Sequence, residues 1–203
     1  MIHSLILSDR RNNQYKTLGI LIFIIYPILS FPFILKGILK RERWAYLLGA
    51  ILMGYIGMLY PPAGDMYRYA EDFNLYKELD WEYFWIFMAL KFDYFLPLLS
   101  WILGKLGAYP ESTRFLFVAC SYYLLLDLYH DITLSNKDMT RRTRVYSLIL
   151  LVPLTFSIYL FRMGFAQVVL VYGIYWFLMK NRKKGLFFRH CPKFCVNGNR
   201  IQL

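Results

Sequence analysis

The chain alternates long uncharged apolar runs with short clusters of charged residues. A helix that crosses a membrane needs about 20 mostly apolar residues, with about 17 as a lower limit. The runs at residues 17–35, 44–64, 145–161 and 163–179 meet this requirement. The pattern therefore predicts an all-α fold in which these four runs are membrane-spanning helices.

Proline and charge mark where the predicted helices bend and end. Pro27 and Pro32 predict a kink in the first run, because proline lacks a backbone N–H and clashes with the preceding turn. The second helix should end near Tyr60, since a Pro-Pro pair follows it. Only Arg162 separates the last two runs, which predicts a helical hairpin.

The basic residues gather in clusters at 36–43, 137–144 and 180–184. Short basic clusters between apolar runs are typical of cytoplasmic loops under the positive-inside rule. The loop at 61–82 is acidic instead, and we place it outside. This topology puts the N-terminus outside, against the positive charge that precedes the first apolar run.

Residues 83–128 hold two apolar segments that are each weak as spans. The acidic loop lies outside and the next basic cluster inside, so an odd number of crossings must separate them. We assign the crossing to residues 114–128, and residues 94–107 to a short re-entrant or interfacial helix on the outer side. The prediction is a polytopic integral membrane protein with about five transmembrane helices and this one short helix.

Composition narrows the class of protein further. The chain has 203 residues, of which 58% are hydrophobic and 18% charged, with a net charge of +11. A soluble domain is about 45–50% apolar and about 25% charged, so this composition favours a lipid bilayer as surroundings. It also excludes disorder, and three cysteines are too few for a disulfide scaffold. The basic residues form no single face, so no nucleic-acid partner is expected.

Polar residues just after the Pro-Pro pair are the first candidate site. If this segment is helical, Asp65, Arg68, Tyr69 and Asp72 share one face. Asp65 would begin the helix, a position that favours a carboxylate. A ligand-binding interpretation is a carboxylate and a cation beside aromatic rings that stack on sugars. The structural alternative is an N-cap, an ion pair and an interfacial aromatic belt.

Arg162 is the second candidate. At an outer boundary near a helix start, its planar guanidinium suits a phosphate, and Gly164 and Ala166 leave room for a close approach. The alternative is an interfacial arginine that extends its charge to water.

Two further polar groups have structural interpretations. Lys91 and Asp93 are interpreted as a polar boundary. His190, Cys191 and Cys195 lack a second pair of zinc ligands, so no metal site is expected.

Several short stretches match one family in order and spacing. They are Met58-Leu-Tyr60 with the following Gly64-Asp65-Met-Tyr-Arg-Tyr69 and Phe73, then Asp93-Tyr-Phe-Leu-Pro-Leu-Leu-Ser100, then Arg162-Met-Gly-Phe-Ala-Gln167, and finally Lys183-Lys-Gly-Leu-Phe187. Through them the chain resembles, over about residues 18–188, the EpsG/Wzy-like family of membrane polysaccharide polymerases. The first stretch is similar to the family's Gly-Asp segment with spaced aromatics, and the third to its Arg-Gln-x-x-Ala type motif.

The resemblance implies a polymerase of lipid-linked oligosaccharide repeat units, for exopolysaccharide, capsule or O-antigen. Such an enzyme is a glycosyltransferase at the outer face of the bacterial cytoplasmic membrane. Its substrate is an oligosaccharide on polyprenyl pyrophosphate, other polysaccharide assembly proteins are its partners, and no cofactor or metal is implied. Asp65 and Arg162 are the implied catalytic residues. The implied substrate-binding residues are Tyr67, Arg68, Tyr69, Asp72 and Gln167.

The chain also departs from the family pattern. Met163 stands where the family often has Gln, and the family continues through further spans that include a His-containing motif. Residues 1–188 are expected to form one transmembrane domain, and the polar tail at 189–203 to arise by truncation or a frameshift. A genuine cytoplasmic tail is the alternative. A truncated chain is expected to be inactive alone, and a flippase or transporter fragment or a non-catalytic scaffold are the other functions considered.

Overall fold

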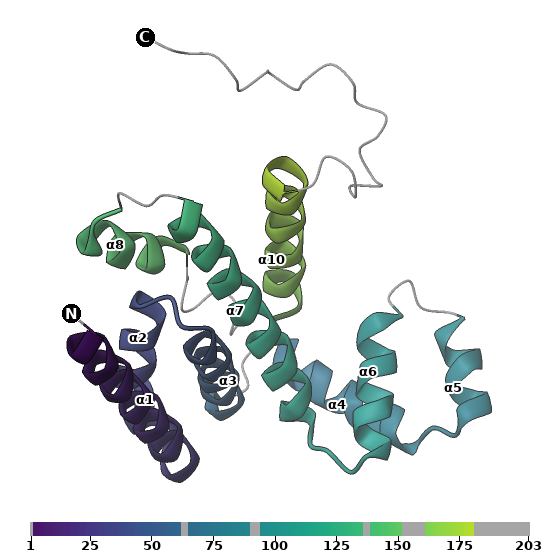
Figure 1. Cartoon of the computed structure of the whole chain (residues 1–203). Coiled ribbons are helices and arrows are strands. Elements are labelled where there is room, and N and C mark those ends of the chain that lie inside the picture. Colours follow the sequence, from purple (N-terminus) through teal and green to yellow (C-terminus); the bar gives the residue numbers. More distant parts are fainter. Residues whose placement is uncertain (1, 62–64, 90–93, 136–138, 152–160, 181–203) are drawn as a thin grey trace, which may run out of the picture.

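The computed structural model describes residues 2–61, 65–89, 94–135, 139–151 and 161–180 (Figure 1). Helices make up the elements of these ranges, and no strand occurs in them. The predicted all-α class is therefore confirmed for the described part of the chain.

The long helix α7 organises the fold (Figure 1). It packs against α3 and α10, and it also contacts α4, α6 and α8. In chain order the elements are α1 (Ile2–Ile25), η1 (Pro27–Ser30), α2 (Phe31–Leu39), α3 (Arg43–Leu59), α4 (Asp65–Glu78), α5 (Trp81–Met88), α6 (Phe95–Lys105), α7 (Pro110–Ser135), α8 (Arg141–Leu151), α10 (Phe161–Tyr175) and the π-helical turn η2 (Trp176–Lys180).

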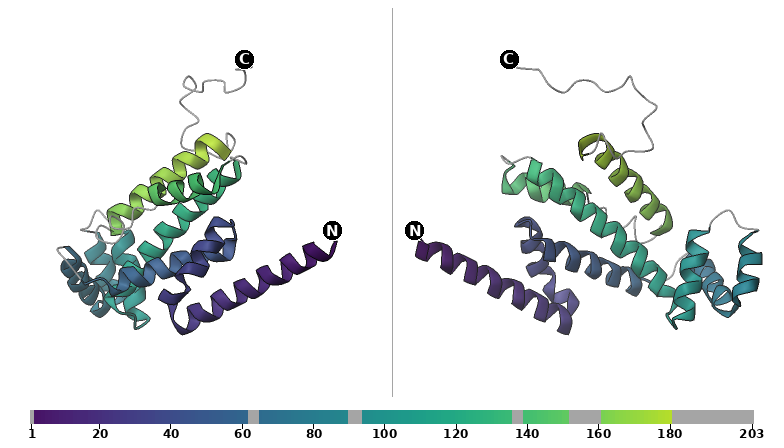
Figure 2. Two further views of the ribbon diagram at one scale, coloured as in Figure 1. Left: turned by 90° about the vertical axis from the view of Figure 1, so that its left-hand side faces the viewer. Right: turned by 45° about the vertical axis from the view of Figure 1, so that its right-hand side comes forward.

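The first apolar run does not form one kinked helix, which corrects the prediction for residues 17–35. Helix α1 ends at Ile25, Tyr26 adopts an extended conformation, and a 3-10 turn follows that begins with Pro27. The chain then folds back, so that the rings of Tyr15 and Phe33 lie 5.1 Å apart. Figure 2 shows α1 as an outermost helix at the edge of the molecule. Proline restricts the preceding residue to extended backbone, which explains the break at this position.

Helix α3 ends at Leu59, before the Pro-Pro pair, as predicted. It approaches α7 closely through two glycines. A Cβ on Gly54 would lie 2.9 Å from the Cβ of Ala119, and one on Gly57 would lie 3.1 Å from Val118. Small residues allow two helix backbones to come this near, as is common between helices in membranes. The pairing of α3 with α7 therefore depends on the absence of side chains at these positions.

Helix α6 confirms the short helix predicted at residues 94–107, with 11 residues. Pro97 stands in its first turn, where a missing N–H breaks no helical hydrogen bond. The helix packs on α4, and a Cβ on Gly104 would lie 2.8 Å from the Cβ of Lys77. Lys91 and Asp93 lie outside the described residues.

Among the described helices, α7 is the one that is long and apolar enough to cross a membrane. It has 26 residues and extends beyond the predicted crossing at 114–128 at both ends. The other apolar helices are shorter, and residues 152–160 of the span predicted at 145–161 lie outside the described residues. Arg162 lies in the first turn of α10 and not in a break between helices, which corrects that detail.

Large apolar side chains cover much of the exterior of the described chain. Ile24, Ile25, Leu106 and Leu170 each expose more than 60% of their surface. Soluble monomers rarely expose extensive apolar patches, so this surface is suited to contact with lipid or protein.

Candidate functional site

A cavity of about 90 Å³ lies between α4, α6 and α7. Its walls combine apolar side chains with hydroxyl, carboxylate and guanidinium groups, a mixture suited to a small polar ligand. The polar lining residues are Tyr67, Tyr69, Asp72 and Tyr76 from α4, Ser100 from α6, and Glu111, Thr113 and Arg114 from α7.

Helix α4 is held in place by its buried face. Met66, Phe73 and Tyr76 recur at helical spacing and are each at most 5% exposed. Tyr76 packs with Phe84 of α5, whose ring centroid lies 6.4 Å away. Because Tyr69 lies one turn from Met66 and from Phe73, the same anchoring fixes the position of its ring at the cavity wall.

Arg114 is the most unusual side chain of the cavity, because it carries a charge and is 6% exposed. Its Nη2 donates a hydrogen bond to the carbonyl of Met58 at 2.9 Å, and its Nη1 lies 3.1 Å from the Sδ of Met66. Met58 belongs to the last turn of α3, where carbonyls lack helical partners and favour a cation. Arg114 thus joins the end of α3 to the first turn of α4.

Two buried polar atoms beside the cavity have no hydrogen-bond partner among the described residues. They are the Nε of Arg114 and the Oγ1 of Thr113, a residue that is 5% exposed. Buried polar groups are nearly always hydrogen-bonded, to protein, water or ligand. The unpartnered atoms therefore mark this end of the cavity as a place for a polar ligand or ordered water.

The structure brings three of the predicted α4 residues to the cavity. Tyr67, Tyr69 and Asp72 line it. Arg68 is exposed and is not part of the lining. Asp65 begins α4, as the sequence predicts, and its side chain lies outside the described part of the structure.

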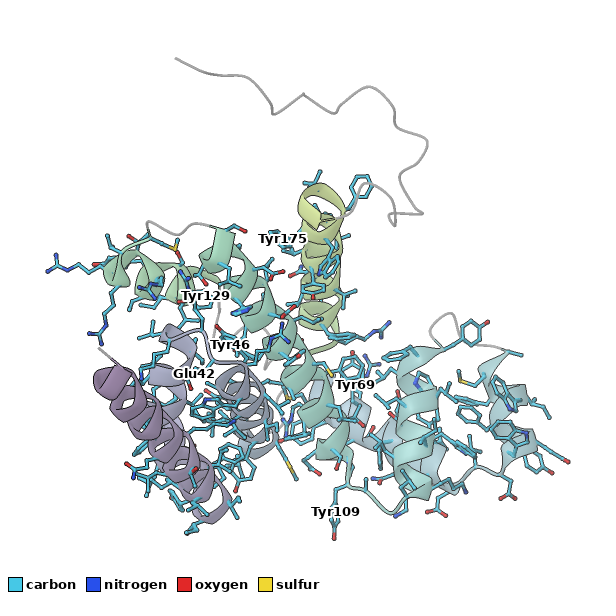
Figure 3. The ribbon with its side chains drawn as sticks, viewed as in Figure 1. Glu42, Tyr46, Tyr69, Tyr109, Tyr129 and Tyr175 are labelled. Atoms are coloured by element: carbon cyan, nitrogen blue, oxygen red, sulfur yellow. The ribbon has the colours of Figure 1, made fainter. Side chains whose placement is uncertain are left out.

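The first turns of α10 lie near the same region. Phe165 and Tyr69 pack against one hydrophobic cluster, and Phe165 meets Phe117 of α7 with ring centroids 5.1 Å apart. Figure 3 shows Tyr69 beside α7, on the side of the α4–α6 group. Arg162 is exposed one turn before Phe165. Gln167 is exposed about 200° around the helix from Phe165, so the structure does not bring it toward the cavity.

Sequence reasoning missed Glu111, Thr113 and Arg114. Arg114 was interpreted as the boundary of a crossing, since it stands at the edge of an apolar run. The position of Arg114 at the edge of an apolar run could have identified it as a candidate. A charge at such an edge can face the protein interior as well as water. Its burial depends on the approach of α3 and α4, which the sequence does not display.

The described residues contain no group of three or more His, Cys, Asp or Glu that could hold a metal ion. His190, Cys191 and Cys195 lie outside those residues. The comparisons of the chain with family profiles, curated proteins and solved structures yield no match.

Proposed function

We propose that this protein acts in the polymerisation of lipid-linked oligosaccharide repeat units at the outer face of the bacterial cytoplasmic membrane, as a multi-pass membrane protein. The observation that carries the proposal is the cavity between α4, α6 and α7. Tyrosine rings, carboxylates and a buried arginine line it together, and such groups are suited to sugar rings, hydroxyls and phosphates. Met66, Tyr67 and Tyr69, which line it, belong to the motif on which the family resemblance rests.

The distribution of charge along α7 supports the proposed orientation. The acidic helix α4 meets the N-terminal end of α7 through Met66 and Arg114. The basic turn after α2 lies at the other end, where Tyr46 of α3 is 3.1 Å from His130. A 26-residue helix is about 39 Å long, and the apolar layer of a bilayer about 30 Å thick. The acidic and basic ends of α7 are thus far enough apart to lie at opposite faces of a membrane.

The proposed reaction joins two lipid-linked glycans. A hydroxyl oxygen of the acceptor sugar bonds to the anomeric carbon of the donor sugar, and the bond from that carbon to the pyrophosphate oxygen breaks. Asp65 is the proposed base that takes the hydroxyl proton. Arg162 is the proposed cation that stabilises the leaving pyrophosphate. Tyr69 and Asp72 would hold the acceptor sugar in the cavity beside Arg114.

Deletion of the reading frame in its own host tests this function. The length of surface glycans is measured by gel electrophoresis. A polymerase defect leaves single repeat units on the surface, and restoration of long chains by the native gene supports the proposal. Absence of all surface glycan would indicate a flippase instead, and unchanged long chains would indicate neither; either outcome overturns the proposal.

Variants then test the assigned roles. Asp65→Asn and Arg162→Gln should each fail to restore long chains while the protein accumulates in the membrane at its usual level. Arg141→Gln is the matched control, because Arg141 is exposed on α8, away from the cavity. Long chains in either site variant would remove that residue from the mechanism.

A further inference from the structure

The turn between α2 and α3 contains an arginine in a position that favours glycine. Arg41 has a φ of 65°, and it is the only non-glycine residue with positive φ among the described residues. Its backbone N–H donates a hydrogen bond to the carbonyl of Ile38 at 2.9 Å, and the N–H of Glu42 donates one to the carbonyl of Gly37 at 3.0 Å. These two bonds define a Schellman helix end, whose left-handed residue is usually glycine. A strained non-glycine residue at such a position suggests that its side chain has a use.

The side chain of Arg41 lies close to two other groups with unsatisfied atoms. The Nε of Arg41, the Nε of Arg144 and the hydroxyl of Tyr129 are all buried and have no hydrogen-bond partner among the described residues. Both guanidinium groups interact electrostatically with Tyr129, which is 1% exposed. Figure 3 shows Tyr129 and Tyr46 in one region, next to the α2–α3 turn that carries Glu42. Three unsatisfied N–H and O–H donors thus gather at this end of α7.

Two acidic side chains near this end of α7, Glu42 and Asp127, each accept a hydrogen bond from another residue. The Nε1 of Trp44 donates a hydrogen bond to Glu42. The hydroxyl of Tyr172 donates one to Asp127 at 2.6 Å. The Nη1 of Arg144 donates to the carbonyl of Leu39 at 3.1 Å, which holds α8 against the end of α2. The Nε donors of the two arginines are left without a hydrogen-bond partner among the described residues.

An apolar cavity begins beside these donors. It has a volume of about 300 Å³ and lies between α2, α3, α7 and α8. Its wall includes Leu39, which lies two residues before Arg41, and Val145, which follows Arg144. No charged residue lines it. The rest of the wall is formed mainly by aliphatic side chains such as Leu52, Leu126 and Leu148. A basic, hydroxyl-bearing end joined to an apolar cavity is complementary to a molecule with a phosphate head and a hydrocarbon chain.

We propose that this site binds an anionic phospholipid of the cytoplasmic leaflet. Its phosphate accepts hydrogen bonds from Arg41, Arg144 and Tyr129, and one acyl chain occupies the apolar cavity. Arginine forms strong, directional hydrogen bonds to phosphate oxygens, and burial of methylene groups adds to the affinity. The inference rests on the membrane placement proposed above and does not depend on the polymerase reaction.

Lipid binding is tested on the full chain purified in a mild non-ionic detergent. The protein is titrated with phosphatidylglycerol, with phosphatidylcholine of the same acyl chains, and with inorganic phosphate, and bound lipid is counted by native mass spectrometry. One phosphatidylglycerol should bind at least about tenfold more tightly than phosphatidylcholine. Both lipids carry the phosphodiester, but the choline of phosphatidylcholine adds a positive charge that the two arginines repel. Inorganic phosphate should compete poorly, because it lacks the acyl chain.

Three variants separate binding from folding. Arg41→Gly removes the guanidinium and relaxes the strained backbone, so it should fold well and lose about tenfold in phosphatidylglycerol affinity. Tyr129→Phe removes a hydroxyl that is unsatisfied without lipid, so it should weaken lipid binding without loss of thermal stability in lipid-free detergent. Arg141→Gln is the charge-matched control, because it also removes one positive charge and Arg141 is exposed on α8.

Several outcomes would overturn the assignment. Equal affinity for the two phospholipids would show that the arginines select no anionic head. Equal competition by inorganic phosphate would show that the cavity takes no acyl chain. Unchanged binding in Arg41→Gly, or an equal loss in the α8 control, would show that net charge and not this site attracts the lipid.

Discussion

Two arginines stand where other residues would fold more easily. Arg41 takes the left-handed place that a Schellman helix end usually gives to glycine. Arg114 is buried beside a cavity, with one guanidinium nitrogen unpartnered among the described residues. Positions that violate local folding preferences are often those at which function sets the residue. Arg114 lines the cavity at the first turn of α7, and Arg41 follows Ile38 and Leu39, which line the apolar cavity beside the middle of α7.

Arg41→Gly is expected to raise the free energy of unfolding by about 1 kcal/mol in detergent that lacks anionic lipid. The left-handed conformation costs a non-glycine residue about 1–2 kcal/mol, and the greater freedom of glycine in the unfolded chain offsets part of the gain. Thermal unfolding of the purified protein measures the change. A destabilised variant would mean that the arginine side chain holds the α2–α3 turn together by itself.

Arg114→Ala is expected to destabilise the protein by about 2–3 kcal/mol, since it removes the hydrogen bond to Met58 and leaves a void. Arg114→Met keeps the apolar stem and should cost less, about 1 kcal/mol. Under the proposed function, both variants should fail to make long glycan chains. Arg114→Met should then lose activity although it keeps most of its stability. Arg141→Met, at an exposed position, should leave both properties unchanged. Full polymerisation by Arg114→Met would restrict Arg114 to a structural role.

Glycine sets the distance between elements in this fold. Helix α3 lies against α7 where Gly54 faces the carbonyl of Phe115 and the Cβ of Ala119. Helix α6 lies against α4 in the same way, with Gly104 on Lys77. The approach at Gly104 joins α4 to α6, two of the three helices that line the cavity.

The same substitution at two glycines should therefore have opposite effects. Gly54→Ala places a methyl group 3.0 Å or less from neighbouring atoms of α7 and should cost about 1–3 kcal/mol. Gly173→Ala, on α10, has open space within 4 Å and should gain about 0.5–1 kcal/mol from its higher helix propensity. The midpoints of thermal unfolding compare the two variants. A neutral Gly54→Ala would show that α3 and α7 separate at little cost.

The sequence predicted those elements whose ends are set by local chemistry. The Pro-Pro pair fixes the end of α3 at Leu59, and the position of α6 follows from its own apolar pattern. Pro27 predicted a kink and not a break, because the direction of the chain after it depends on the packing of Tyr15 against Phe33. Helical spacing placed Tyr69 and Asp72 on one face, together with Asp65 and Arg68, and Tyr67 was implied by the family resemblance alone. Arg114 was not identified, because its burial results from three helices meeting.

At the scale of the whole molecule, α7 separates two chemically different ends. The acidic residues of α4 gather near its first turns, and the basic residues that flank α2 and α8 near its last. Such asymmetry is what the positive-inside rule requires of a membrane protein. The orientation of the whole chain can therefore be tested at two exposed positions, one for each end.

Cysteine labelling in intact cells tests the proposed orientation. In a background without native cysteines, Asn74→Cys should react with an impermeant maleimide from outside, because it is exposed on α4. Arg142→Cys, exposed on α8, should react only after the membrane is permeabilised. Labelling of both positions in intact cells, or of the α8 position alone, would refute the topology. A cysteine at a buried position such as Val118 should stay unlabelled throughout.

The fold-back of α1 on α2 has a consequence for how the chain is inserted. The amino group of Lys36 lies 4.1 Å from the centre of the Tyr15 ring, so the start of α1 and the basic end of α2 lie toward the same membrane face in the proposed topology. In that topology the N-terminal segment, with Arg10, Arg11 and Lys16, would stay in the cytoplasm, and not outside as predicted from the sequence. That removes the conflict between its charge and the orientation expected from the sequence. During biosynthesis, the two helices would enter the bilayer together as a hairpin, and no positively charged tail would have to be translocated.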